Sequence, residues 1–144
     1  MAEPIIVSTT IHCTKEAAWK ALTHQPTMIQ WYFDNIEAFK PEVDFYTEFL
    51  IVVEDRSYTH QWRINEVKPL EKIAYDWTFA EHQGITNSAF EIKEKDGLVE
   101  VCVTITGLEN MPQDIPEFTK EACEGGWRYF LDRLKTFLEK GTAH

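Results

Sequence analysis

The sequence has few cysteines, no long apolar run and no excess of basic residues. Its three cysteines, Cys13, Cys102 and Cys123, are an odd number without C-x-x-C spacing, which argues against a disulfide framework and indicates a reducing compartment. The longest apolar run, residues 49–53, is far shorter than the roughly 20 residues that cross a bilayer. The first residues lack the basic and apolar regions of a secretory signal. We therefore expect a soluble, cytoplasmic protein with no membrane partner.

Basic residues are outnumbered by acidic ones, 14 to 24, which gives a formal net charge of −10. Lys and Arg are scattered and form no basic stripe, so the protein repels phosphate backbones and we expect no nucleic-acid partner. Aromatic residues, in contrast, make up 13% of the chain, which fits either a core of bulky side chains or an aromatic-lined pocket. The length of 144 residues predicts a single domain over residues 1–144.

The N-terminal part predicts one strand and two short helices. Residues 5–11 are rich in β-branched side chains and predict a strand. Thr14 is placed to cap a short helix that Pro26 ends. Residues 28–33 then predict a second helical turn or two, and their apolar character indicates that they pack inward.

Five further strands are predicted by alternation of apolar and polar residues between positions 43 and 105. The gaps between them have the length of turns, and the Asp-Gly pair at 96–97 is a hairpin signal. Such a series predicts an antiparallel meander with one face toward the core. The predicted inward positions are Phe45, Thr47, Phe49, Ile51, Tyr58, His60, Trp62, Ile64, Ile73, Tyr75, Trp77, Phe79, Ser88, Phe90, Ile92, Val99, Val101, Val103 and Ile105.

The last part of the chain, residues 116–140, predicts a long amphipathic helix. Its apolar side chains recur with a period of 3.6 at Trp127, Phe130, Leu131, Leu134, Phe137 and Leu138. Asp114 and Glu117 predict a capping box at its start. The pair Gly125-Gly126 costs about 1 kcal/mol per glycine in a helix, and indicates a close backbone approach, a bend or a thin spot beside Trp127. We expect this helix to lie across the sheet and to leave a hollow beneath it.

The resulting order β-α-α-β-β-β-β-β-α predicts an α+β helix-grip fold, with a curved antiparallel six-stranded sheet, two short helices and a long C-terminal helix. Residues 18–23, 64–69 with 73–77, and 126–138 resemble the first helix, the middle hairpin and the final helix of the START-like (SRPBCC) superfamily. Together they resemble the branch named after the C-terminal domain of the activator of heat-shock protein 90 ATPase. The resemblance implies the fold and carries no catalytic signature.

A candidate site follows from the aromatic residues on the inward strand faces. If these faces point toward the first and last helices, they line a mostly aromatic pocket with a few polar tips, which is typical of a small-molecule site. The alternative is a solid aromatic core in which His60 and Tyr75 bond to neighbours. The predicted ligand-binding residues are Trp31, Tyr58, His60, Trp62, Tyr75, Trp77, Phe90, Trp127 and Leu131.

We assign no catalytic residue, metal site or cofactor from the sequence. His60 has the intrinsic pKa of a general base, but no orienting partner is evident. A zinc site from His12, Cys13, His24 or His82 is not expected, because zinc needs four converging ligands and the adjacent His12 and Cys13 point to opposite strand faces. Cys123 lies beside acidic residues that disfavour its thiolate, so we do not interpret it as a nucleophile.

The favoured hypothesis is a non-catalytic protein that binds a hydrophobic or aromatic small molecule, such as a lipid, between its sheet and last helix. The resemblance implies two alternatives. One is a chaperone partner that stimulates heat-shock protein 90 ATPase, and the other is a cyclase- or aromatase-like enzyme that would depend on His60 or Tyr75. We expect a monomer or a weak dimer.

Overall fold

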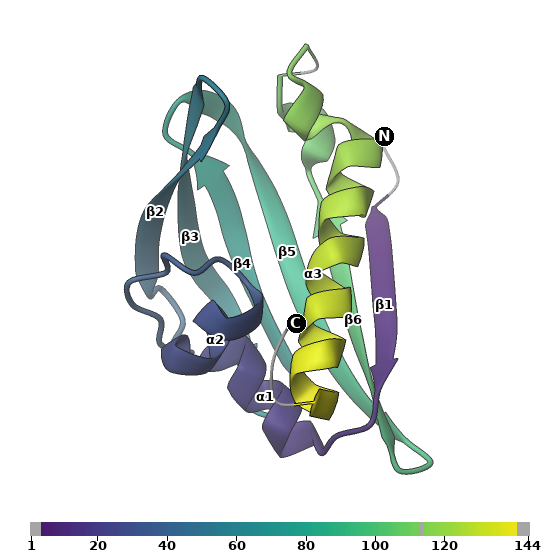
Figure 1. Cartoon of the computed structure of the whole chain (residues 1–144). Coiled ribbons are helices and arrows are strands. Elements are labelled where there is room, and N and C mark those ends of the chain that lie inside the picture. The colour runs from purple at the N-terminus through teal and green to yellow at the C-terminus, as the bar shows by residue number, and fades with distance from the viewer. Residues whose placement is uncertain (1–3, 113, 141–144) are drawn as a thin grey trace.

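The structure is a computed structural model that describes residues 4–112 and 114–140. It confirms the predicted α+β helix-grip fold and the order of its elements (Figure 1). The elements are β1 (Ile5–Ile11), α1 (Lys15–Thr23), α2 (Gln25–Trp31), β2 (Tyr46–Val53), β3 (Arg56–Lys68), β4 (Lys72–Phe79), β5 (His82–Lys95), β6 (Leu98–Thr106), the 3-10 turns η1 (Leu108–Asn110) and η2 (Pro116–Phe118), and α3 (Lys120–Lys140). No helix of the described residues has the length and apolar content needed to span a membrane.

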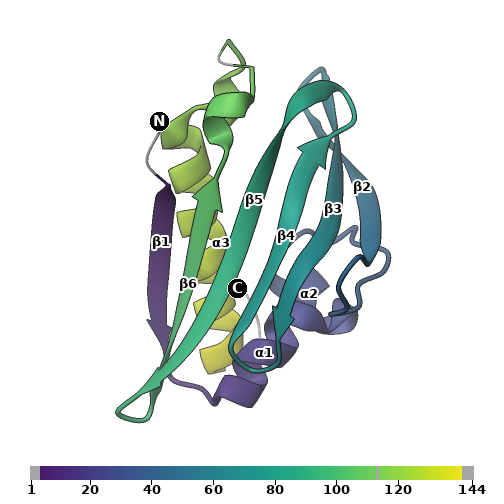
Figure 2. The same cartoon turned by 180° about the vertical axis from the view of Figure 1, so that it is seen from behind.

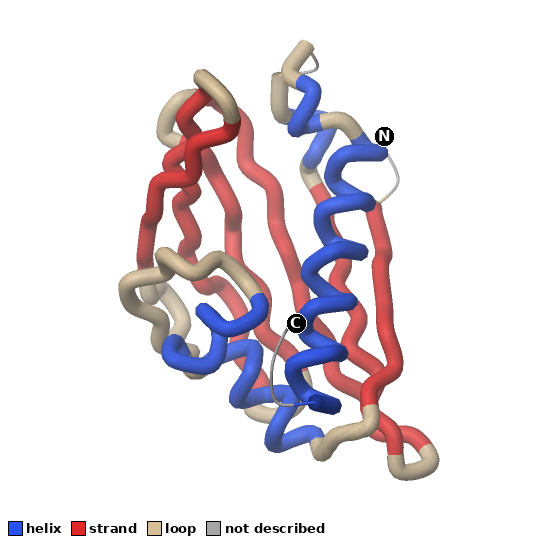
Figure 3. The backbone as a smooth tube through the Cα atoms, in the orientation of Figure 1, coloured by secondary structure: helices blue, strands red, loops and turns tan. Residues whose placement is uncertain are grey.

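The six strands form one antiparallel sheet in the spatial order β1-β6-β5-β4-β3-β2, seen from behind in Figure 2. Strands β2 to β6 are a meander, and β1 returns to pair with β6, from Ile5 opposite Ile105 to Ile11 opposite Val99. The predicted hairpin between β5 and β6 turns at Asp96 and Gly97, whose φ angles of 52° and 79° are the positive values that a type I′ turn requires. Figure 3 shows the helices on one face of this curved sheet.

The first two helices follow the chain's capping signals. The Thr14 side chain accepts a hydrogen bond from the backbone N–H of Ala17 over 3.0 Å and so caps α1 as predicted. The second helix differs from the prediction, because it begins at Gln25 and ends at Trp31, with Pro26 in its first turn. Proline lacks an N–H that this turn would leave unbonded in any case, so Pro26 starts α2 as well as ending α1.

The start of α3 differs from the prediction. Residues 116–118 form the separate turn η2, and Thr119 then takes an extended conformation (φ −75°, ψ 156°) that breaks the helical path. The Thr119 hydroxyl accepts a hydrogen bond from the Ala122 N–H over 3.2 Å, so Thr119 caps α3. The predicted capping box of Asp114 and Glu117 is therefore wrong.

Helix α3 lies across the sheet and covers the free edge of β1. The Arg128 guanidinium donates to the Ser8 carbonyl over 2.9 Å, and the Lys135 ammonium donates to the Thr10 carbonyl over 2.6 Å. Because an edge strand exposes unpaired backbone groups that promote aggregation, these contacts protect the sheet as well as holding the helix. The apolar stripe of α3 is buried against the sheet at Trp127, Leu131 and Leu134.

One end of the space between sheet and helices is filled with aromatic rings, which we call the closed aromatic core. Tyr32, just after α2, stacks on Trp31 with ring centroids 4.6 Å apart and on Trp62 at 5.3 Å. Its hydroxyl lies 2.9 Å from the hydroxyl of Tyr75, and the Trp31 indole N–H donates to the Ala21 carbonyl over 2.8 Å. The closed aromatic core consists of five aromatic residues and one leucine that packs with them, all buried: Trp31, Tyr32, Trp62, Tyr75, Phe90 and Leu131.

Candidate functional site

At the other end, the interior holds a cavity of about 370 Å³ between the sheet and the first half of α3. Its walls come from β2 to β6, and residues of η1, η2 and α3 form most of the remaining lining. Ala122 and Gly126 of α3 line the cavity and are solvent-exposed, so the cavity opens to solvent along this helix. The interior thus contains both arrangements that the sequence allowed, a solid aromatic core at one end and an aromatic-walled cavity at the other.

Four of the nine predicted ligand-binding residues line the cavity: Tyr58, His60, Trp77 and Trp127. The other five belong to the closed aromatic core, outside the cavity lining: Trp31, Trp62, Tyr75, Phe90 and Leu131. Alternation along a strand identifies the inward face and carries no information on how far along that face a cavity extends. The Tyr32 ring divides the two regions, because it occupies the space among Trp31, Trp62 and Trp127.

Several lining residues were not predicted. Ile51 and Phe79 belong to the same inward series as the predicted residues, so the alternation that identified Tyr58 also contained them. Phe33, Glu117 and Phe118 lie outside regular strands, and no periodic signal marked them as part of a site. Their positions depend on how two connecting segments fold back onto the sheet.

His60 is the central polar residue of the cavity wall. Its Nδ1 accepts a hydrogen bond from the Trp77 indole N–H over 3.0 Å, and its ring stacks nearly parallel on Phe49 with centroids 5.1 Å apart. Burial lowers the pKa of His60 to about 4, so the ring is neutral at pH 7. Because Nδ1 acts as an acceptor, the single proton of the neutral ring is on Nε2. His60 is therefore arranged to donate a hydrogen bond rather than to remove a proton.

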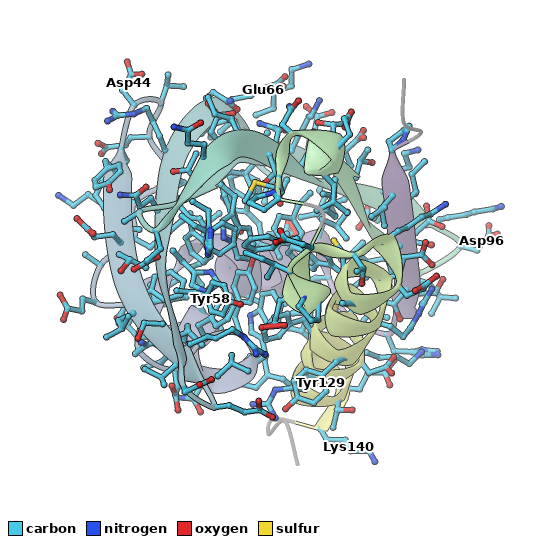
Figure 4. The ribbon with its side chains drawn as sticks, turned by 90° about the horizontal axis from the view of Figure 1, so that it is seen from above. Asp44, Tyr58, Glu66, Asp96, Tyr129 and Lys140 are labelled. Carbon is cyan, nitrogen blue, oxygen red and sulfur yellow. The ribbon has the colours of Figure 1, made fainter. Side chains whose placement is uncertain are left out.

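The cavity rim is held by a hydrogen-bonded group of three side chains, which we call the rim triad: Arg56, Tyr58 and Glu117. The Tyr58 hydroxyl and the Arg56 Nε each donate to Oε1 of Glu117 over 2.6 Å, which ties η2 to β3. Figure 4 shows Tyr58 among the interior side chains, whereas Asp96 and Lys140 lie at the periphery. The hydrogen bond from Tyr58, and then that from Arg56, lowers the pKa of the Glu117 carboxyl, so this carboxylate is ionised at neutral pH.

Cys123 contributes a sulfur atom to the wall but not an activated one. Burial, and then the charge of Glu124, raises the pKa of its thiol to about 11. The thiol is therefore protonated at neutral pH and is a poor nucleophile. Over residues 4–112 and 114–140, no group of three or more His, Cys, Asp and Glu side chains is placed to hold a metal ion.

Both glycines of the α3 pair are exposed, and one of them lines the cavity. A Cβ atom built at either Gly125 or Gly126 meets no atom within 4 Å. This excludes the close backbone approach that was one of the predicted explanations. Gly126 lines the cavity and Gly125 does not, so the missing side chain at Gly126 leaves part of the cavity open. This agrees with the expected thin spot beside Trp127.

A curved antiparallel sheet that grips a long C-terminal helix over an interior cavity defines a START-like, or SRPBCC, helix-grip domain. Residues 12–139 match the family described as Activator of Hsp90 ATPase homolog 1-like protein, and the chain belongs to this family. No curated protein matches the sequence.

Solved structures share this fold at low sequence identity. Protein CV1439 from Chromobacterium violaceum is 20% identical with a TM-score of 0.76, over 96% of this chain and 99% of that one. The Aha1 dimer from Colwellia psychrerythraea is 19% identical with a TM-score of 0.76, over 97% and 98%. DynU16, from the dynemicin biosynthetic locus, is 17% identical with a TM-score of 0.77, over 99% of this chain. This chain spans about half of DynU16, 49% of its length.

Proposed function

We propose that this protein binds a hydrophobic or aromatic small molecule in the cavity between its sheet and α3, without transforming it chemically. The supporting observation is the cavity of about 370 Å³, which lies within the range of about 300–1,000 Å³ typical of small-molecule sites. Its walls are mainly aromatic and aliphatic, with a few polar groups such as His60 and Ser88. This combination of apolar walls and few polar groups is the usual composition of a ligand pocket.

The chemistry of the lining favours binding over catalysis. Nδ1 of His60 already accepts from Trp77, so its one proton is on Nε2, and the Cys123 thiol is protonated. A cyclase- or aromatase-like reaction would need a proton acceptor at the ligand. The Glu117 carboxylate of the lining already accepts hydrogen bonds from Tyr58 and Arg56, and these bonds lower its pKa and make it a weak base. Tyr75, the other candidate for that role, lies outside the cavity, and burial raises its pKa.

The test is a titration followed by tryptophan fluorescence. Trp77 and Trp127 line the cavity, so ligand binding changes their surroundings and thus their emission. We expect a saturable change with some members of a panel of aromatic polyketides, sterols and lipids. If no compound gives a saturable response, the proposal is wrong.

The family itself supports a second candidate, a protein that docks on heat-shock protein 90 and stimulates its ATPase. The net charge of −10 would suit a basic surface on the chaperone. This candidate predicts that the purified chaperone is retained by the immobilised protein at low salt and released as salt is raised. An unchanged ATPase rate in the presence of excess protein would exclude it.

A further inference from the structure

The cavity wall carries three features that together restrict the chemical class of ligand. The first is a hydrogen-bond donor held in one orientation. The His60 ring is fixed between the Trp77 indole N–H at Nδ1 and the parallel ring of Phe49, so Nε2–H is the polar group that it offers to a ligand. When a ligand expels water from the cavity, this N–H needs a new acceptor, because a buried donor without a partner is costly.

The second feature is the charge of the lining. Of the described residues that line the cavity, Glu117 is the only one that carries a charge at neutral pH, and the lining contains no Lys or Arg. The guanidinium of Arg56 donates to Glu117 and is not part of the lining. A ligand carboxylate in this cavity would meet another carboxylate at the rim and no cation inside. Burial of an unpaired charge is strongly unfavourable.

The third feature is shape. The walls present ring edges and ring faces to the cavity, as in the pairs Trp77–Trp127, at 5.9 Å and 82°, and Phe33–Phe130, at 4.9 Å and 62°. Such tilted pairs suit the face or the edge of another aromatic ring. A volume of about 370 Å³ lies near the lower end of the range of about 300–1,000 Å³ that is typical of small-molecule sites. This size favours a compact ligand, such as a two-ring aromatic compound with a short substituent, over a larger one.

From these three features we infer that the cavity selects an uncharged, two-ring aromatic ligand with a carbonyl or similar acceptor, which accepts a hydrogen bond from His60 Nε2, and that it rejects carboxylates such as fatty acids. The inference rests on the proposed binding function and specifies its ligand class. It also separates two groups of hydrophobic ligands that the fold alone does not distinguish, since fatty acids carry their charge at one end and neutral aromatic ketones carry none.

Three probes of nearly equal size test the inference on the wild-type protein: 2-acetylnaphthalene, 2-ethylnaphthalene and 2-naphthoate. Dissociation constants are measured at pH 7 by tryptophan fluorescence and by calorimetry. We expect 2-acetylnaphthalene to bind most tightly. The ethyl compound, which has no acceptor, should bind about tenfold more weakly, because it leaves the His60 N–H without a partner. The naphthoate should bind at least about tenfold more weakly than the ketone, because its charge has no cation to pair with.

A change of pH provides a second readout on the same protein. A carboxylic acid of ordinary pKa near 4 becomes about a hundredfold more populated in its neutral form between pH 7 and pH 5. The apparent affinity for naphthoate should therefore rise over this range, while the affinity for the ketone stays constant, since His60 remains mostly neutral with a pKa of about 4.

Three variants at two positions assign the effects to residues. His60→Phe should remove the difference between the ketone and the ethyl compound, and His60→Gln, which keeps an N–H donor, should retain part of it. Glu117→Gln should reduce the ratio of the dissociation constant of naphthoate to that of the ketone. Circular dichroism and thermal melting establish that each variant is folded, and the comparison of the three probes on the wild type stands without them.

The outcomes are distinct. If naphthoate binds as tightly as the ketone at pH 7, the inferred ligand class is wrong while the proposed binding function stands. If the ethyl compound matches the ketone, the hydrogen bond from His60 is not used for selection and the inference is likewise overturned. If none of these probes binds and the broader panel also gives no response, the inference and the proposed function fail together.

Discussion

The indole N–H of Trp77 donates to Nδ1 of His60 across 3.0 Å, between neighbouring strands β4 and β3. This bond joins two residues of the cavity wall and determines which nitrogen of the imidazole carries the proton. It also gives the indole N–H of Trp77 a hydrogen-bond partner, which a buried tryptophan usually has. Burial keeps the ring neutral at pH 7 and this bond leaves its proton on Nε2, so a histidine with the intrinsic pKa of a catalytic base becomes a neutral donor.

We predict that His60 makes stability depend on pH. The unfolded chain binds a proton at His60 near pH 6.5, whereas the folded protein does so only near its lowered pKa of about 4. The free energy of unfolding should therefore fall as the pH drops from about 6.5 to 4, by about 3 kcal/mol in total. Urea unfolding at a series of pH values measures this loss. The His60→Gln variant is the control, and an identical pH profile for variant and wild type would contradict the prediction.

We predict that Gly126→Phe fills the cavity without unfolding the protein. A Cβ atom meets no neighbour at this position, and helical side chains lean toward the preceding turn, where Ala122 and Cys123 line the same cavity. Ligand binding should be lost, while the free energy of unfolding stays the same or rises by up to about 1 kcal/mol through better helix propensity. Fluorescence titration and thermal melting measure the two effects.

The matched control for this prediction is Gly125→Phe. Gly125 is the adjacent helical glycine, has equal room for a Cβ atom, is exposed and does not line the cavity. This variant should bind ligand as the wild type does. Equal loss of binding in both variants would show that the cavity is not the binding site.

We predict that the rim triad holds η2 against β3. Tyr58→Phe removes the hydroxyl that donates to Glu117 over 2.6 Å, which should lower the free energy of unfolding by about 1 kcal/mol. Hydrogen exchange of residues 114–118 should become faster, because this segment loses one of its bonds to the sheet. The control is Tyr46→Phe on β2, where the tyrosine is 39% exposed. Unchanged exchange in Tyr58→Phe would show that the rim triad does not hold the segment.

The two buried tyrosines of the closed aromatic core should be strongly coupled. Their hydroxyl groups lie 2.9 Å apart, and Tyr32 and Tyr75 are only 5% and 1% exposed. Either single change to Phe leaves the other hydroxyl without this partner and should cost about 1–3 kcal/mol. The double variant should be more stable than the sum of the single effects predicts. Denaturant unfolding of the four proteins measures the coupling, and strict additivity would contradict it.

The corrected start of α3 also makes a measurable prediction. Thr119→Ala removes the hydroxyl that accepts from the Ala122 N–H, and should lower the free energy of unfolding by about 1 kcal/mol. Asp114→Ala, at the position that the sequence suggested as the cap, should change it little. If thermal melting showed a larger loss of stability for Asp114→Ala than for Thr119→Ala, the capping box predicted from the sequence would be supported instead.

Much of the fold is determined by local sequence patterns. Alternation with a period of two assigns each strand residue to one face, and Tyr58, His60, Trp77 and Phe90 are buried as their positions predicted. This works because strand geometry sets the direction of successive side chains without reference to the rest of the protein. The 3.6-residue period of α3 similarly predicted its buried stripe at Trp127, Leu131 and Leu134.

Tertiary structure alone decided where the interior is solid and where it is hollow. Tyr32 follows α2 in a segment without a strong periodic signal, and its ring fills the space beside Trp62 that the sequence assigned to a ligand. The sequence predicted Glu117 as part of a helix cap, whereas in the structure it lies at the cavity rim, because the chain before α3 folds back against β3. Both outcomes depend on contacts between residues far apart in the sequence, and such contacts leave no periodic trace in either segment. Local sequence patterns thus determined which residues face the interior. The boundary of the cavity was determined by side chains from distant parts of the sequence, because these fill the space at one end of the interior and leave it open at the other.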